Sequence, residues 1–290
     1  MRTYSIIICT YNRAKLLRET IISLLTFLKD KPNYEIIVID NNSSDDTQVV
    51  CTQFPVLRYI LELNQGLSHA RNRGILEAEN DILLFLDDDI EVANNFFSVF
   101  ESIFKDDNLY IAGGKVLPFN TSIPNWLPKQ YYYLVSIFDL GDASKSVTKL
   151  MGANYAMRKE VAEKVGSYDI NLGRKGNVLT GGEEIDYLNR AKSEGFDILY
   201  HPDLVVYHKI SEKLDLNYIL NYSFNLGKSE SIMISKINPS KHILKKLKAY
   251  FTIQASKYFL DVKFSESTVT YIKLNYQYSL GYLGLHNHKS

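Results

Sequence analysis

The sequence has little that would cross-link the chain or anchor it in a membrane. Only two cysteines occur among 290 residues, Cys9 in an apolar run and Cys51 near an expected helix end. This excludes a disulfide framework and a thiolate metal site, and it favours a reducing cytosol. No stretch reaches the roughly 18 consecutive apolar residues of a membrane-spanning helix, and the apolar run at residues 5–9 is too short for a secretory signal. We therefore expect a soluble, cytoplasmic chain.

An excess of charge of either sign is also missing. The 33 basic residues balance the 33 acidic residues, so the formal net charge is zero. Such a chain has no overall field that would attract nucleic acid, and we expect no nucleic-acid partner. A hydrophobic share of 46% is sufficient for the core of one large α/β domain or of two smaller domains.

Short apolar runs rich in β-branched residues alternate with helical patterns in the first half of the chain. The runs cover residues 4–9, 35–40, 57–61, 82–86 and 110–113. Between the first two runs, one helix face carries Leu16, Thr20, Ile21, Leu24 and Leu28. Continuous apolar strands suit a sheet covered on both faces. The pattern therefore predicts an α/β fold with a Rossmann-like, mostly parallel central sheet flanked by helices.

Polar clusters follow three of these runs at the expected carboxyl ends of the strands. They are Thr10-Tyr11-Asn12-Arg13, the stretch at residues 40–45, and Asp87-Asp88-Asp89. Ligands of doubly wound sheets bind beyond these ends, so we expect the three clusters to meet at one crevice. The side chains of Asp87 and Asp89 point to the same side and can hold a hard divalent cation that bridges two phosphates. The alternative for the three aspartates is a solvated turn or a helix N-terminus.

The second half of the chain has a different texture. Residues 115–150 are rich in proline and aromatic residues without periodicity, which predicts a long, partly ordered loop. Residues 151–158 predict a strand that leads into a helix at 159–165. Residues 215–290 show helical periodicity without a catalytic cluster.

Two glycines and two glutamates, at residues 181–184, precede a further predicted helix. Its apolar positions Ile185, Leu188 and Ala191 share one face. We expect residues 1–114 and 115–214 to form two halves of one domain, followed by a helical extension at 215–290.

Seven segments, in this order, resemble the motifs of family 2 glycosyltransferases with the GT-A fold. They read SIIICTYNRAKLLRETIISLL, EIIVIDNNSSDDT, NQGLSHARNRGI, DILLFLDDDIEV, GANYAMRKEVAEKVGSYD, GGEEIDYLNRA and HPDLVVYH, and they cover roughly residues 3–208. The resemblance implies an inverting enzyme that transfers a sugar from a nucleotide-diphosphate donor to a hydroxyl of a saccharide or a lipid-linked saccharide. Assembly of a polysaccharide or glycan is the implied setting. The resemblance makes residues 1–114 the nucleotide-sugar-binding half of the GT-A domain and residues 115–214 its acceptor-binding and catalytic half.

The resemblance also implies which residues bind the nucleotide. They are Thr10, Asn12, Arg13, Asp40, Asn42, Gly66, Arg71, Asp87 and Asp88. Asp40 is similar to the aspartate that hydrogen-bonds a uracil or thymine ring, which makes a UDP-sugar the expected donor. The alternative for Asp40 is a helix cap, a role for which Asn42 and Ser43 compete. Gly66 allows close backbone approach, and Arg71 can reach a phosphate or orient the aspartates.

The metal site and the catalytic base follow from the same resemblance. Asp89 is the expected direct metal ligand, with Asp87 and the distal His208 completing a site for Mn²⁺ or Mg²⁺. A single histidine is otherwise more often structural. The family places a Glu-Asp pair at the helix that carries the base, whereas this chain has Glu183-Glu184 and so departs at the second position. We expect Glu184 to be the base, and first-turn glutamates that favour the helix dipole are the alternative.

The acceptor side and the C-terminal helices leave more alternatives open. Trp126 and Asn154 are assigned to acceptor binding, with the tyrosines at residues 131–133 as further candidates. Aromatic clusters are, however, more often part of a core. Near the C-terminus, a helix with Lys241, Lys245, Lys246 and Lys248 beside Ile243, Leu244, Leu247 and Phe251 can rest on an anionic membrane at the cytoplasmic face. A solvated helix face and a homodimer contact remain open.

Two other functions compete with glycosyl transfer. A nucleotidyltransferase can use a related sheet with an aspartate-bound metal, but it needs a glycine-rich basic signature after the first strand, which CTYNRAKL lacks. A nucleotide-sugar-binding protein that has lost catalysis is the other alternative, and the joint presence of Asp87, Asp89, Glu184 and His208 disfavours it.

Overall fold

The computed structural model describes residues 2–176, 178–260 and 262–285. The chain divides into two compact units. The first, here called the sheet unit, comprises the described residues of Met1–Asn120, Ser136–Asn171 and Glu183–Lys209. The second, the helical unit, comprises those of Thr121–Val135, Leu172–Gly182 and Ile210–Ser290.

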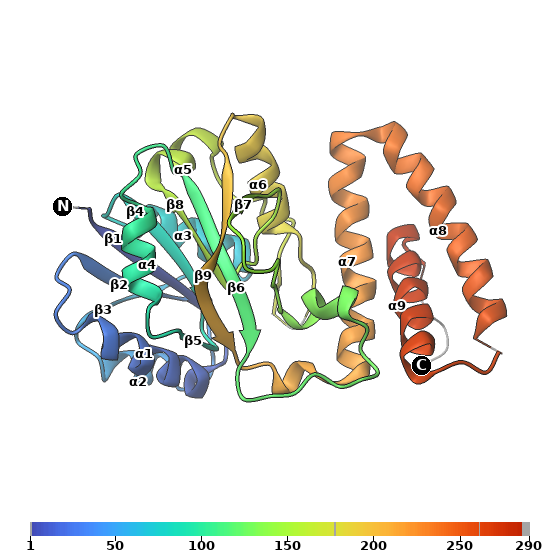
Figure 1. The fold of residues 1–290 in the computed structure, drawn as a ribbon, viewed down its shortest axis with the longest axis horizontal. Helices are drawn as coiled ribbons and strands as arrows, with labels where there is room; N and C mark the ends of the chain where they lie inside the picture. The colour runs from blue at the N-terminus through green and yellow to red at the C-terminus, as the bar shows by residue number, and fades with distance from the viewer. Residues whose placement is uncertain (1, 177, 261, 286–290) are drawn as a thin grey trace. The chain divides into compact units, whose positions relative to one another are not determined.

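The sheet unit is built around one mixed sheet with the strand order β3-β2-β1-β4-β8-β6-β9-β5 (Figure 1). The first four strands are parallel: β1 (Tyr4–Thr10), β2 (Tyr34–Asp40), β3 (Leu57–Leu61) and β4 (Ile82–Asp87). The remaining strands are β5 (Ile90–Val92), β6 (Ile111–Pro118), β7 (Lys145–Ser146), β8 (Asn154–Arg158) and β9 (Ile198–His208). Strand β8 runs antiparallel to β4 and β6, whereas β6 and β9 are parallel. The predicted α/β class with a mostly parallel sheet is confirmed.

Helices cover this sheet because its central strands are apolar on both faces. The side chains of Ile6, Ile7 and Ile8 in β1 are all buried, and successive side chains of a strand point to opposite faces. The helices of the sheet unit are α1 (Ala14–Leu28), α2 (Thr47–Thr52), α3 (Leu67–Glu77), α4 (Phe96–Ile103), α5 (Lys159–Val165) and α6 (Glu183–Ser193). Helix α3 packs so closely on β1 that a Cβ at Gly74 would lie 2.4 Å from Ile7 Cγ2.

The structure corrects several details predicted from the pattern. The buried face of α1 includes Leu17 rather than Leu16, and that of α6 includes Tyr187, whereas Ile185 is 37% exposed. In both helices the buried face lies slightly further around the helix axis than predicted. Leu16 and Ile185 are hydrophobic residues beside this face, so the sequence pattern alone could not exclude them from it. The expected loop at 115–150 also begins as strand, since β6 continues to Pro118 before the 3-10 helix Lys129–Val135.

The helical unit contains three long helices, α7 (Leu216–Ile237), α8 (Pro239–Phe259) and α9 (Glu266–Leu283). Each begins at a side-chain cap, provided by Asp215, Asn238 and Ser265, which accepts a hydrogen bond from a first-turn backbone N–H. A Cβ at Gly281 would lie 1.9 Å from Phe224 O, so α7 and α9 cross in direct backbone proximity. Within the described residues, no helix combines the length and the apolar character needed to cross a membrane.

Candidate active site

The carboxyl ends of three neighbouring strands form the framework of the site. Strand β1 lies between β2 and β4, and the register aligns Thr10 with Asp40 and Cys9 with Asp87. The three polar clusters that follow these strands therefore leave the sheet at the same edge. This adjacency is a consequence of parallel pairing, which places equivalent ends together.

An acidic group with one histidine occupies the end of β4. His208 Nε2 lies 2.6 Å from Asp89 Oδ1 and 3.7 Å from Asp87 Oδ2. One potential ligand atom from each of the three residues lies within 4.8 Å of the other two. Strand β5 brings about this meeting: it follows the aspartates directly and pairs antiparallel with β9, in a register that sets Ile90 opposite His208. Residues about 120 positions apart in sequence are thus joined by one short strand pair.

The middle aspartate, Asp88, points into the protein interior. The Thr10 hydroxyl donates a hydrogen bond to Asp88 Oδ2 at 2.7 Å, and Arg13 Nη1 donates to Asp88 Oδ1 at 3.0 Å. The same Arg13 nitrogen lies 2.8 Å from Asp89 Oδ2. Burial raises the pKa of Asp88, and the positive charge of Arg13 opposes that shift. Arg13 therefore supplies part of the positive charge that three adjacent carboxylates require.

The residues around Asp89 suit a divalent cation. Two carboxylates and one imidazole are a donor set that Mn²⁺ accepts, and carboxylates also suit Mg²⁺. Asp89 and His208 are buried, whereas the side chain of Asp87 remains 35% exposed, so the group is open on one side.

The loops after β1 and β2 are held together by hydrogen bonds from predicted nucleotide-binding residues. Asp40 is buried, and its carboxylate accepts from the backbone N–H of Ser43 at 2.9 Å and from the Tyr59 hydroxyl at 2.8 Å. Asn12 Oδ1 accepts from the backbone N–H of Ser44 at 2.7 Å. Asn12 and Asn42 have positive φ values of 52° and 63°, a conformation that asparagine tolerates better than most residues. Asp40 thus orders the loop that follows β2.

Asn41 connects two of these loops, a role that the sequence analysis did not assign to it when it placed residues 40–45 at the expected crevice. Its buried side chain donates from Nδ2 to Asn64 O at 2.8 Å, and its Oδ1 accepts from Gly66 N at 2.7 Å. Gly66 adopts φ 140°, which other residues rarely reach. The only sign of this role in the sequence was the position of Asn41 directly after a predicted strand, and many residue types occur at such positions.

The two adjacent glutamates at the start of α6 occupy different environments. Glu183 is buried and accepts a hydrogen bond from Arg71 Nη1 at 2.7 Å. The side chain of Glu184 is 20% exposed, with its Oε2 3.9 Å from the same Arg71 nitrogen. Burial, followed by the neighbouring charge of Glu184, raises the pKa of Glu183 to about 8. At neutral pH Glu183 is therefore mostly protonated.

This raised pKa predicts a pH-dependent stability. Below about pH 4.5, Glu183 is protonated in both the folded and the unfolded chain, so its neutral form makes its full contribution to the free energy of unfolding. Between about pH 4.5 and about 8 the unfolded chain loses this proton while the folded protein retains it, so stability falls as the pH rises. We expect Tm to decrease over this interval by on the order of 5 °C more in the wild type than in Glu183→Gln. Parallel pH profiles of Tm for the two proteins would contradict the raised pKa.

Gly152 and Tyr168 complete the surroundings of Arg71, and neither was singled out from the sequence. A Cβ at Gly152 would lie 2.4 Å from Arg71 Nη2 and 2.6 Å from Glu184 Oε1. The guanidinium of Arg71 stacks over the ring of Tyr168 at 5.6 Å. The absence of a side chain at residue 152 thus gives Arg71 and Glu184 the space they occupy. Arg71 acts on the glutamate pair in this structure, rather than on the aspartates.

The two predicted acceptor-binding residues, Asn154 and Trp126, lie in different units of the structure. Asn154 is buried in the sheet unit, where its Nδ2 group donates to Lys115 O at 3.0 Å and Leu204 O at 2.8 Å. Any acceptor contact of Asn154 would therefore involve Oδ1, and it stays a prediction. Trp126 lies half-buried in the helical unit. Of the tyrosines at residues 131–133, Tyr131 is buried and packs on Tyr271, as the core alternative expects.

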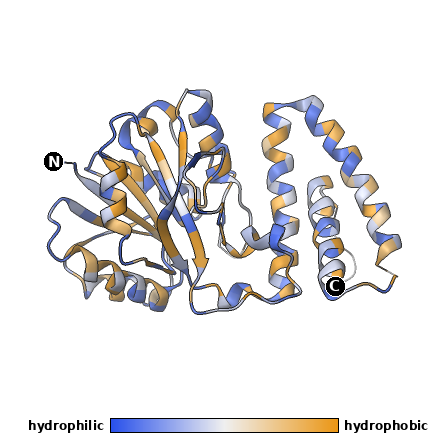
Figure 2. Ribbon diagram, in the orientation of Figure 1, coloured by the Kyte–Doolittle hydropathy of each residue, from blue (hydrophilic) through white to orange (hydrophobic). Residues whose placement is uncertain are grey.

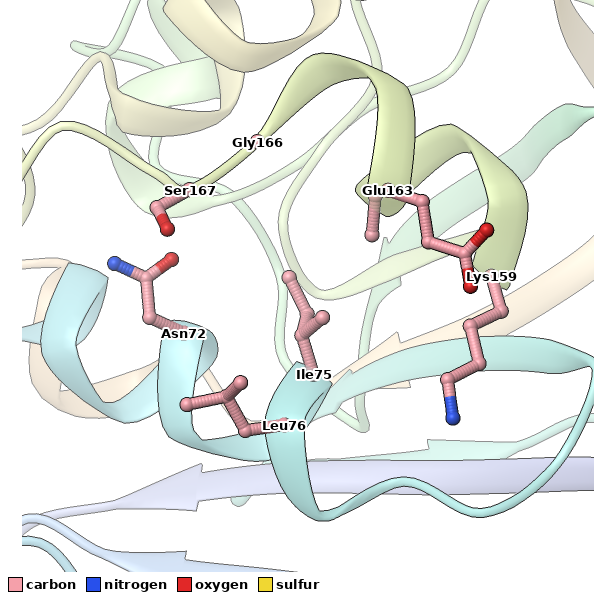
Figure 3. Close-up of a pocket in the computed structure, with 8 residues that line it drawn as sticks. Asn72, Ile75, Leu76, Lys159, Glu163, Gly166 and Ser167 are labelled. Atoms are coloured by element: carbon pink, nitrogen blue, oxygen red, sulfur yellow. The ribbon is translucent and has the colours of Figure 1, made fainter.

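A pocket of about 300 Å³ lies elsewhere on the sheet unit, between α3 and α5 (Figure 3). Its lining residues include Asn72, Ile75, Leu76, Lys159 and Glu163. None of the predicted site residues lines it. Lys159 and Glu163 are the ionisable side chains there, and the metal-competent group belongs to the edge of the sheet instead.

A mixed α/β sheet with an Asp-x-Asp-plus-histidine group at its carboxyl edge is the arrangement expected of the GT-A glycosyltransferases that the seven sequence segments resemble. The chain belongs to glycosyl transferase family 2, because the profile described as "Glycosyl transferase family 2" matches residues 5–166, more than half of its length. It is 26% identical over 240 residues to a glucosyl-dolichyl phosphate glucuronosyltransferase of Haloferax volcanii, an alignment that covers 79% of this chain and 76% of that protein.

Two solved structures share its fold. One is the mannosyltransferase PcManGT from Pyrobaculum calidifontis in complex with GDP-Man and Mn²⁺, with a TM-score of 0.62, 15% identity, and coverage of 97% of this chain and 87% of that chain. The other is GalNAc-T7 with UDP, GalNAc and Mn²⁺, with a TM-score of 0.58, 16% identity, and coverage of 98% and 57%. These similarities confirm the GT-A fold.

Proposed function

We propose that the protein transfers a sugar from a nucleotide-diphosphate donor, a UDP-sugar, to a hydroxyl of a saccharide or lipid-linked saccharide with inversion at the anomeric carbon. The observation that carries this proposal is the Asp87-Asp89-His208 group beside the loops of β1 and β2. Solved proteins of the same fold contain UDP or GDP-Man together with Mn²⁺, which supports a nucleotide donor and a metal. The glucosyl-dolichyl phosphate in the name of the Haloferax volcanii relative supports a lipid-linked acceptor.

In this proposal Asp87, Asp89 and His208 would hold Mn²⁺ or Mg²⁺, which would supply Lewis-acid stabilisation of the negative charge on a departing diphosphate. The protein contributes the geometry of the ligands. Arg13 holds Asp88 and the second oxygen of Asp89, at 3.0 and 2.8 Å. Asp89 is thus oriented from one side by Arg13 and from the other by His208. Thr10 fixes Asp88 and so keeps the middle carboxylate away from the ligand group.

Glu184 is the group that accepts the proton of the acceptor hydroxyl. As this proton leaves, the hydroxyl oxygen forms a bond to the anomeric carbon, and the bond from that carbon to the diphosphate oxygen breaks. A single displacement of this kind inverts the anomeric configuration. Glu184 is suited to the role because it is partly exposed, whereas the neighbouring Glu183 is buried and takes up the proton that the pair retains.

The donor preference can be measured by ligand-induced stabilisation. We expect UDP-sugars to raise Tm in the presence of Mn²⁺, with a smaller effect from GDP-sugars and little effect of UDP-sugars in EDTA, because a ligand that binds only the folded state stabilises it. The stabilising donor is then tested for transfer to saccharide and lipid-linked acceptors, with the anomeric configuration of the product determined by NMR. Metal-independent stabilisation, or a product with retained configuration, would contradict the proposal.

A further inference from the structure

Helix α8 carries charge of only one sign in a chain that is neutral overall. Its 21 residues include five lysines and neither aspartate nor glutamate. The lysines are Lys241, Lys245, Lys246, Lys248 and Lys257. The whole chain balances 33 basic against 33 acidic residues, so positive charge is concentrated on this helix.

One side of α8 packs within the helical unit, and a lysine beside it forms an ion pair with α7. Ala249, Ile253 and Ser256 are buried on this side. Lys245 lies next to it and forms an ion pair with Glu230 of α7 at 2.6 Å. These contacts fix which face of the helix points inward, and they leave four lysines without an ion pair in the part of the chain that the structure describes.

The opposite side of α8 is apolar and exposed. Six large side chains, each more than half exposed, lie on it: Ile243, Leu244, Leu247, Tyr250, Phe251 and Tyr258. At about 100° per residue they occupy an arc of roughly 120° centred opposite Ala249. Figure 2 shows hydrophobic residues, in orange, recurring along the length of α8. A face of this size is unusual for a helix in contact with water.

The four remaining lysines border this apolar face. On the helical wheel, Lys241 and Lys248 lie along one edge of the apolar arc, and Lys246 and Lys257 lie along the other edge. Long lysine side chains in such positions can place their ammonium groups at the headgroup level while the apolar residues between them enter the acyl boundary. Beyond the helix, Val262 and Phe264 are also exposed.

We propose that the outer face of α8 binds the surface of a lipid bilayer that contains anionic lipids, with the helix lying parallel to the membrane plane. This proposal goes beyond the sugar transfer proposed above and does not rest on it. Charge complementarity selects the occupant. A second copy of the chain would set lysines against lysines with no acidic residue on α8 to compensate them, whereas an anionic headgroup layer attracts both edges of the face.

Vesicle co-sedimentation of the full chain tests the proposal. We expect binding to vesicles of three parts phosphatidylcholine to one part phosphatidylglycerol, and about tenfold weaker binding to pure phosphatidylcholine. Added NaCl should weaken the first interaction, because salt screens exposed charges. The double variant Leu247→Glu, Phe251→Glu should lose at least about tenfold in vesicle affinity, because it places two carboxylates at the centre of the apolar face.

Matched control variants distinguish binding through the outer face of α8 from nonspecific binding of the protein to vesicles. Leu76→Glu changes another highly exposed leucine, on α3, and should leave vesicle binding intact. Lys246→Glu with Lys248→Glu should reduce binding to the anionic vesicles, whereas Lys29→Glu with Lys105→Glu, at exposed positions of the sheet unit, should have little effect. The α8 variants should keep the wild-type Tm, since their side chains do not pack in the helical unit.

Three results would overturn the proposal. The first is a failure of the wild-type chain to bind the anionic vesicles. The second is equal vesicle binding by wild type and the Leu247, Phe251 variant. The third is a wild-type dimer in the absence of lipid that this variant converts into a monomer, which would make the face an interface between copies. Vesicle binding is measured without donor or acceptor. A chain that does not transfer sugar can therefore still bind vesicles, and each of the two proposals can fail without the other.

Discussion

Asp89→Asn is expected to lower kcat/KM for sugar transfer by about 10³-fold and to remove the stabilisation of the protein by Mn²⁺ with a UDP-sugar. Asp89 is buried and lies within 2.8 Å of both Arg13 and His208. Replacing it with asparagine keeps the shape of the side chain and removes the negative charge that a divalent cation requires. Asparagine is a better choice than alanine, because alanine would leave Arg13 and His208 without a polar partner at this position.

The measurement combines kinetics with metal titration. Mn²⁺ is titrated into each protein in the presence of the stabilising nucleotide sugar, and Tm and the transfer rate are recorded together. Asp30→Ala, which removes an exposed aspartate at the end of α1, is the control and should behave as wild type. Wild-type activity with an unchanged Mn²⁺ requirement in Asp89→Asn would show that Asp89 is not a metal ligand.

Glu184→Gln is expected to reduce kcat by about 10²- to 10⁴-fold while leaving donor binding unchanged. The amide cannot accept the proton of the acceptor hydroxyl, yet it retains the size of the side chain beside Arg71 and Gly152. KM for the donor should therefore change little, because the proposed donor site lies at the ends of β1, β2 and β4. The readouts are single-turnover transfer and calorimetric donor binding.

Glu183→Gln provides the internal comparison for this assignment. Glu183 already carries a proton at neutral pH, since its pKa is raised to about 8, and glutamine resembles that neutral form. We expect its kcat to fall by less than about tenfold. A large loss in Glu183→Gln with near-normal turnover in Glu184→Gln would reverse the roles of the two residues.

The fold could be predicted from local patterns because its central strands are apolar on both faces and its helices follow a regular stripe. The wrong details were those for which the sequence allowed more than one helix face or more than one strand length. Leu16 and Leu17 are adjacent, so the pattern of α1 accepted either of them as the core position. Strand β6 continued to Pro118 because its partner β9 runs to His208, and the length of a partner strand is not encoded locally.

The candidate site shows the same division. The carboxylates were identifiable because charge directly after a buried strand is unusual, and Glu183-Glu184 because it matched a motif at a helix start. The environments that separate the two glutamates were not identifiable. They arise from Arg71 and from the space at Gly152, more than 30 residues away along the chain in each case. A glycine gives no signal of its own in the sequence, and an arginine can pair with any nearby acid.

The sequence by itself determined the family, the α/β class and the residue types available for metal binding and proton transfer, because these depend on composition, periodicity and ordered motifs. The family resemblance had already implied that Asp89 and His208 lie together, and the structure places them 2.6 Å apart. Only the tertiary structure decided two other pairings, Asp88 with Arg13 and Glu183 with Arg71. It also decided that the apolar side of α8 faces outward. Charge interactions and burial depend on distances through space, and those distances are set by strand pairing and helix packing between segments remote in the chain.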